Sequence, residues 1–166
     1  EFTNSLGMPW AEGLTLVRDT LELMELKKHI KIITSGKIVT GFSLFKALAL
    51  GADTINSARG MMLALGCIQA RRCNTNHCPA GVATNNPRLT VGLVVEDKRV
   101  RVANFHGQTL KAFAELMGAC GVSKTSDITR AHVFRRMESG QVLNLAEIYP
   151  TTEPRASRFL EAPSAF

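Results

Sequence analysis

A chain of 166 residues, 45% hydrophobic and 20% charged, is long and apolar enough for one domain with a sizeable core, which excludes a disordered chain. No apolar run approaches the ~20 residues that span a bilayer, so we expect no membrane segment in this chain. The net charge of +6 is dispersed without interleaved aromatic residues, which argues against nucleic acid as the main partner and is compatible with small anionic ligands.

The first two-fifths of the chain alternate between predicted helices and strands. Leu14, Val17, Leu21 and Met24 recur at helical spacing, and Gly51 is placed to end a later helix. The expected elements, in chain order, are a helix over 14–24, a strand over 30–34, a helix over 42–50, a strand over 52–55 and an apolar helix from 57 to 67.

Strands that alternate with short helices predict a parallel sheet. Two strands cannot close such a sheet, whereas a (β/α)8 TIM barrel has eight strands over ~250 residues. We therefore expect an α/β fold in which residues 1–66 form the end of a TIM barrel, about its last two strands, within a longer parent chain.

Small residues follow both predicted strands. Ser35-Gly36-Lys37 follows the first strand and Ser57-Ala58-Arg59-Gly60 the second. In barrels, the loops after strands 7 and 8 often hold a phosphate with backbone amides, which small residues allow to come close. Two other interpretations stay open: Gly36 is an ordinary turn residue, and Arg59 is a solvated surface cation.

Three cysteines lie within twelve residues, as Cys67, Cys73 and Cys78, with Pro79 directly after the last. Thiolates favour iron–sulfur clusters, zinc or copper(I). The C-x5-C-x4-C spacing lacks the short step of zinc sites and fits an iron–sulfur cluster better, while a segment without metal stays open. The four cysteines do not resemble a secreted disulfide scaffold, so we expect a reducing cytosol.

The C-terminal part is expected to be a helical extension over 85–140 and a tail over 141–166. A second helix containing His132 is predicted after Ser126-Asp127. The main helix of the extension is predicted from an apolar stripe at helical spacing: Val102, Phe105, Thr109, Phe113, Leu116 and Met117.

The cysteine segment, 67–84 with Leu65-Gly66 before it, resembles the cluster segment of the glutamate synthases, which reads roughly G-C-x5-C-x4-C-P-x-G-V-A-T. The resemblance covers about residues 5–122, and the remainder is most similar to stand-alone FMN-binding glutamate synthase-like proteins. Further similar segments are Gly7-Met8-Pro9-Trp10 (a loop before a helix), Ser35 to Gly41 (the loop after strand 7) and Gly51-Ala52-Asp53 (the start of strand 8).

The resemblance implies an FMN-dependent barrel that reduces the 2-iminoglutarate formed from 2-oxoglutarate and glutamine-derived ammonia to L-glutamate. It implies an electron donor, either ferredoxin or an NAD(P)H-oxidising subunit, and a [3Fe-4S] cluster between donor and flavin. By position, Cys67, Cys73 and Cys78 become the cluster ligands. The residues implied at the flavin phosphate are Ser35, Gly36, Lys37, Ala58 and Arg59.

The chain departs from the family at both strand ends. Family members commonly have Asp-Gly-Gly at Ser35-Gly36-Lys37 and Gly-Thr at Ala58-Arg59. No catalytic residue is assigned. Two further functions stay open: a flavoprotein subunit of the methylamine–glutamate methyltransferase type, and a non-catalytic cluster-binding or structural fragment.

Overall fold

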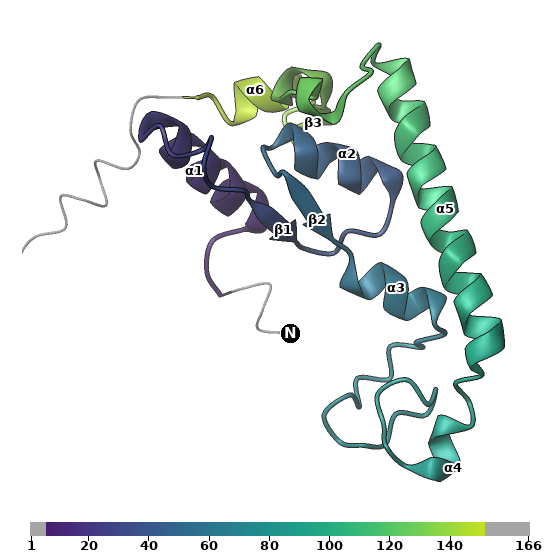
Figure 1. The fold of residues 1–166 in the computed structure, drawn as a ribbon. Helices are drawn as coiled ribbons and strands as arrows, with labels where there is room; N and C mark the ends of the chain where they lie inside the picture. The colour runs from purple at the N-terminus through teal and green to yellow at the C-terminus, as the bar shows by residue number, and fades with distance from the viewer. Residues whose placement is uncertain (1–5, 152–166) are drawn as a thin grey trace, which may run out of the picture.

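The computed structural model of the protein describes residues 6–151 as a mixed α/β fold, in agreement with the predicted class (Figure 1). No helix within residues 6–151 is both long and apolar enough to cross a membrane. The elements are α1 (Trp10–Leu23), β1 (Ile33–Ser35), α2 (Gly41–Ala49), β2 (Thr54–Asn56), α3 (Ala58–Ala64), α4 (Pro87–Thr90), α5 (Val95–Ala119), the 3-10 turns η2 (Thr125–Asp127) and η3 (Arg130–His132), β3 (Phe134–Arg136), β4 (Val142–Asn144) and α6 (Leu145–Ile148).

The predicted parallel pair is present. β1 and β2 pair in parallel with Thr34 opposite Ile55, and α2 forms the crossover between them. The first strand is shorter than expected and begins at Ile33 rather than at residue 30, because only the last part of the β-branched run meets β2. The β1–α2–β2 unit therefore follows the hydrophobic pattern, while its bounds follow the pairing.

The ends of α2 are specified by local residues. The Thr40 side chain accepts a hydrogen bond from the Ser43 backbone N–H, and the Ser43 hydroxyl in turn accepts one from the Thr40 N–H, which together form a capping box. Gly51, just past the helix, has φ +110°, a conformation that favours glycine. Both predicted boundaries of this helix hold within one residue.

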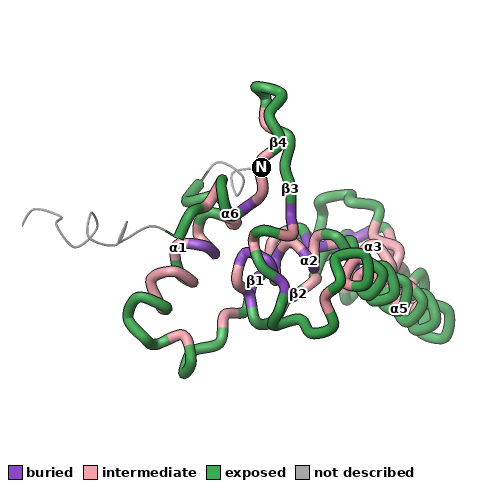
Figure 2. The backbone as a smooth tube through the Cα atoms, turned by 90° about the horizontal axis from the view of Figure 1, so that it is seen from above, coloured by how far each residue is buried: buried purple, intermediate pink, exposed green. Residues whose placement is uncertain are grey.

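The core lies between α1, the β1–β2 sheet, α2 and the C-terminal elements. Figure 2 shows the buried positions gathered around β1, β2 and α2, whereas α5 is mostly exposed. Phe45, Leu50 and Leu145 are the largest fully buried side chains, so residues from both ends of the described chain share one core. The core cluster comprises Leu14, Phe45, Ala49, Leu50, Ala52, Ile128, Val133 and Leu145.

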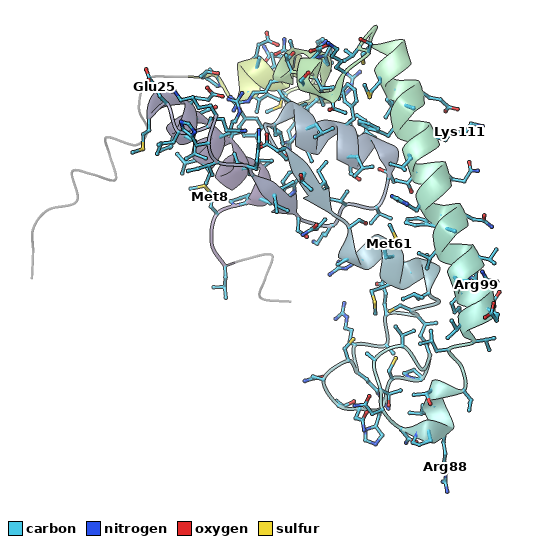
Figure 3. All side chains as sticks on the ribbon, in the orientation of Figure 1. Met8, Glu25, Met61, Arg88, Arg99 and Lys111 are labelled. Carbon is cyan, nitrogen blue, oxygen red and sulfur yellow. The ribbon has the colours of Figure 1, made fainter. Side chains whose placement is uncertain are left out.

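The long helix α5 runs along one side of the molecule, from the cysteine segment to the C-terminal elements (Figure 1). It packs closely on α2, because a Cβ at Gly41 would lie 2.6 Å from the Phe113 nitrogen. It also packs on α3, where a Cβ at Gly60 would lie 3.2 Å from the Phe105 ring. Arg99 and Lys111 project from the opposite side of the helix (Figure 3).

The C-terminal segment differs from its prediction. The helix expected to include His132 is wrong: η3 ends at this residue and β3 follows, paired antiparallel with β4. Val133 is buried, and its carbonyl accepts a 2.8 Å hydrogen bond from the Leu145 N–H, so tertiary contacts replace helical ones. Within the expected tail, 141–166, β4 and α6 are ordered, and the part from 152 onward lies outside the described residues.

Arg130 ties the C-terminal elements to α1. Its guanidinium donates to both carboxylate oxygens of Asp19, at 2.6 and 3.1 Å, and to the Tyr149 carbonyl at 2.8 Å. Both charged side chains are largely buried. A bidentate pair of this kind holds two elements in a fixed relative orientation.

Asp53 joins the start of β2 to the residues before β1. Its carboxylate accepts hydrogen bonds from the Lys27 ammonium and from the Ile32 backbone N–H, each at 2.7 Å. Burial alone would raise the pKa of Asp53. The Ile32 N–H, then Lys27 and Lys31, outweigh burial and hold that pKa below its ordinary value of 3.8.

Replacing Gly41 with Ala should lower the free energy of unfolding by roughly 1–3 kcal/mol, because the added methyl group forces α5 away from α2. Urea denaturation followed by circular dichroism measures the change. Gly107→Ala is the matched control: it lies on α5 with open space around it, so the same methyl group should not destabilise the protein there. Equal effects at the two positions would contradict the close contact.

A second prediction concerns acid stability. Since the folded-state pKa of Asp53 is lowered, its contribution is fully present above about pH 4 and is lost as the pH falls through the folded-state value. Asp53→Asn should therefore lower the urea midpoint at pH 6 and flatten its dependence on pH below 4. An Asp53→Asn variant whose urea midpoint depends on pH as in the wild type would contradict this role of Asp53.

Candidate functional site

The two strand ends expected to form a phosphate site lie side by side. Ser35, the last residue of β1, pairs with Asn56, the last residue of β2. The segments that follow, Gly36-Lys37 and Ala58-Arg59, therefore leave the same edge of the sheet. Ser35, Lys37, Ala58 and Arg59 are exposed at this edge.

Gly36 lies against the ring of Trp10 at the start of α1. A Cβ at position 36 would be 3.2 Å from the Trp10 Cγ, closer than an ordinary contact. The Lys46 ammonium from α2 lies 5.7 Å from the centroid of the same ring, within cation–π range. The Trp10 indole therefore packs against the loop after β1 and also contacts Lys46 of α2.

Lys37 has φ +55°, in the left-handed region that favours glycine. The family pattern named above has a glycine at this position. The chain therefore keeps a backbone conformation that glycine adopts without strain, and places a long cationic side chain on it. Non-glycine residues in this region often mark functional loops.

The cysteine segment connects α3 to α4 as an irregular loop. Cys67 is half-buried just after α3, Cys73 is exposed, and Cys78 is buried with 8% of its surface exposed. A hollow of about 470 Å³ lies beside Cys73. Across residues 6–151, no three His, Cys, Asp or Glu side chains are arranged to hold a metal ion, so the three sulfurs do not converge on one point.

The sulfur of Cys78 lies among backbone amides. The N–H of Ala83 has the largest effect and lowers the pKa of the Cys78 thiol; burial opposes it, and the amides of Ala80, Val82 and Gly81 add to the lowering. The Gln69 N–H similarly donates to the Cys67 sulfur, at 3.4 Å. Donors to sulfur stabilise the thiolate, the form in which cysteine binds metals.

The loop is closed by side chains of its own. The Thr84 hydroxyl donates to the Asn76 carbonyl at 2.6 Å, and the Asn85 N–H donates to the Asn76 side-chain oxygen at 2.7 Å. Asn76 itself adopts φ +62°. These bonds connect the residues on either side of Cys78 to each other.

Sequence reasoning missed three contributors to these sites. The sequence pattern puts Trp10 in a loop motif, whereas its contact with Gly36 depends on the tertiary fold. It puts Ser57 with the strand-end residues and gives no sign that the Ser57 hydroxyl donates to the Ile38 carbonyl at 2.6 Å. The amides after Cys78 had one available signal, Gly81, whose φ of +74° favours glycine.

The chain is similar to several known proteins. Residues 1–123 match the family described as the conserved region in glutamate synthase. The chain is 40% identical over 145 residues to the glutamate synthase large subunit-like protein YerD of Bacillus subtilis, covering 87% of this chain and 28% of that protein. It is 35% identical over 127 residues to the archaeal glutamate synthase (NADPH) of Methanocaldococcus jannaschii, covering 76% and 25%.

A more distant relative is the glutamate synthase (NADH) of Saccharomyces cerevisiae, 32% identical over 115 residues, which cover 69% of this chain and 5% of that protein. The chain spans between 5% and 28% of the length of these three relatives. The family match includes both strand ends and the whole cysteine segment.

Replacing Gly36 with Ala should move the Trp10 indole, since the new methyl group would press on it. Trp10 is the only tryptophan of the chain, so its fluorescence reports the contact directly. We expect emission at longer wavelength and a loss of about 1 kcal/mol in the free energy of unfolding. Gly118→Ala, with no neighbouring atom within 4 Å, should leave the emission unchanged. An unshifted spectrum in Gly36→Ala would disprove the contact.

Proposed function

The chain belongs to the glutamate synthase family, and from this premise we propose that it forms part of an oxidoreductase that makes L-glutamate reductively from 2-oxoglutarate and ammonia. The relatives named above include NADH- and NADPH-dependent glutamate synthases. The electron donor would be ferredoxin or an NAD(P)H-oxidising subunit, and the compartment a reducing cytosol. The function rests on family membership together with the chemistry of the two candidate sites.

In this proposal, residues 1–66 supply the last two strands of a (β/α)8 barrel, 67–84 the cluster segment and 85–140 a helical extension. The parallel β1–β2 pair supports the barrel, because parallel strands are normally covered on both faces. Ile33 in β1 is 63% exposed, so one face of the pair lacks such a cover within the described residues. Further strands of the parent protein would cover it.

The flavin phosphate would lie at the shared edge of the two strand ends, near Ser35, Gly36, Lys37, Ala58 and Arg59. Ser35 and Asn56 pair in register there, and both following loops are open to solvent. The side-chain charges of Lys37 and Arg59 suit an anionic group. FMN, when bound, supplies hydride chemistry. The role of these residues would be to hold and orient its phosphate.

Cys67, Cys73 and Cys78 would ligate a [3Fe-4S] cluster, which supplies one-electron chemistry when bound. The donor set fits: three thiols lie in one loop, and the sulfurs of Cys67 and Cys78 receive backbone N–H groups. Hydrogen bonds to sulfur are among the features that tune iron–sulfur clusters. Within residues 6–151 the three sulfurs do not form a metal-binding group, so the loop would have to rearrange to hold the cluster.

The observation that carries the proposal is the environment of Cys78. Backbone amides, that of Ala83 first, lower the pKa of this buried thiol, and it lies within a segment that the family match includes in full. In a cysteine that only fills a core, apolar surroundings instead raise the pKa of the thiol.

The test is a Cys73→Ser substitution in the intact protein, purified without oxygen. We expect the wild type to carry about three iron and four sulfide per chain with brown absorbance, and the variant to lose both together with much of its thermal stability. Cys120→Ser, at the end of α5 and outside the segment, should retain iron and colour. Stoichiometric zinc without labile sulfide in the wild type would refute the cluster.

A further inference from the structure

Ser57 occupies the junction between the two strand-end loops. It is the residue before α3, directly next to Ala58, and it follows Asn56, where the paired ladder of β1 and β2 ends. Its hydroxyl donates a 2.6 Å hydrogen bond to the carbonyl of Ile38, which is 2% exposed and directly follows Lys37. This bond therefore connects the two loops one step beyond the end of the strand ladder.

The hydroxyl forgoes its usual role at this position. A serine before a helix normally accepts a hydrogen bond from a backbone N–H of the first helical turn. Ser57 makes no such cap, and its side chain bonds across to the other loop instead. Its Oγ also lies where a side chain at position 60 would collide with it: a Cβ added to Gly60 would be 2.8 Å away. The Ser57 hydroxyl thus donates to the Ile38 carbonyl and does not cap α3.

We propose that Ser57 is a positioning residue for the FMN phosphate. By fixing Ile38 to the start of α3, it sets the separation between Gly36-Lys37 on one loop and Ala58-Arg59 on the other. The inference rests on the proposed function, since it assumes that both loops contact the same phosphate. Ser57 acts through these neighbours and does not itself touch the ligand.

Riboflavin differs from FMN only in lacking the phosphate group, so comparing the binding of the two flavins isolates the contribution of the phosphate site. In the intact protein, we expect Ser57→Ala to weaken FMN binding about fivefold, the effect of one lost hydrogen bond, while riboflavin binding stays within twofold of the wild type. Flavin fluorescence quenching measures both dissociation constants. Ser57→Thr retains the hydroxyl and should restore the wild-type ratio of riboflavin to FMN dissociation constants.

Thr109→Ala is the matched control. It removes another partly buried hydroxyl-to-carbonyl hydrogen bond, to Phe105 at 2.8 Å, but on α5 and away from the strand ends. It should leave the ratio of dissociation constants unchanged. If Ser57→Ala does not fold, Ser57→Cys keeps the side-chain volume with a weaker donor and should lower the same ratio.

The outcomes separate the two proposals. A wild type that binds FMN and riboflavin equally would refute the phosphate site itself. A wild type that prefers FMN, with the same preference in Ser57→Ala, would refute the positioning role alone. Equal weakening of both flavins in Ser57→Ala would show a merely structural residue and would likewise overturn the inference.

Discussion

The fold depends on the close approach of α5 to α2 at Gly41. α5 is 25 residues long and has no buried residue, so it cannot be held by enclosure. It is held along one side only. There Gly41 of α2 allows the α5 backbone to approach closely, and Gly60 of α3 allows the Phe105 ring of α5 to do the same. Because α5 joins the cysteine segment to the C-terminal elements, this line of contact helps to place both of them relative to the β1–β2 sheet (Figure 1).

Sequence reasoning succeeded where local chemistry decides the structure. The β-branched run before Ser35 and the placement of Gly51 predicted the β1–α2–β2 unit within a few residues. It failed where partners are distant. The segment around His132 has helix-compatible residues, but η3, β3 and α6 are set by contacts such as the bond between the Leu145 N–H and the Val133 carbonyl. The cysteine spacing likewise predicts ligand type and not the positions of the sulfurs.

The two candidate sites relate differently to the family pattern. At the strand ends the side chains differ from the pattern, yet the φ of +55° at Lys37 preserves a glycine-like backbone. In the cysteine segment the side chains match, and the surrounding amides at Cys78 accompany them. A phosphate that is bound mainly by backbone N–H groups tolerates changes of the neighbouring side chains. A thiolate ligand cannot be replaced by the backbone, so a metal site of this kind requires the cysteines themselves.

The Arg130–Asp19 pair has a consequence for how the chain folds. It joins residues 111 positions apart, and the entropy of closing so long a loop must be met before the contact contributes. We expect the sheet unit with α1, α2 and α5 to assemble first, from nearer contacts, and the C-terminal elements to be fixed to α1 only when Arg130 pairs with Asp19. Folding would then be slow for a chain with this much helix, since its rate is governed by contact order and not by helix formation.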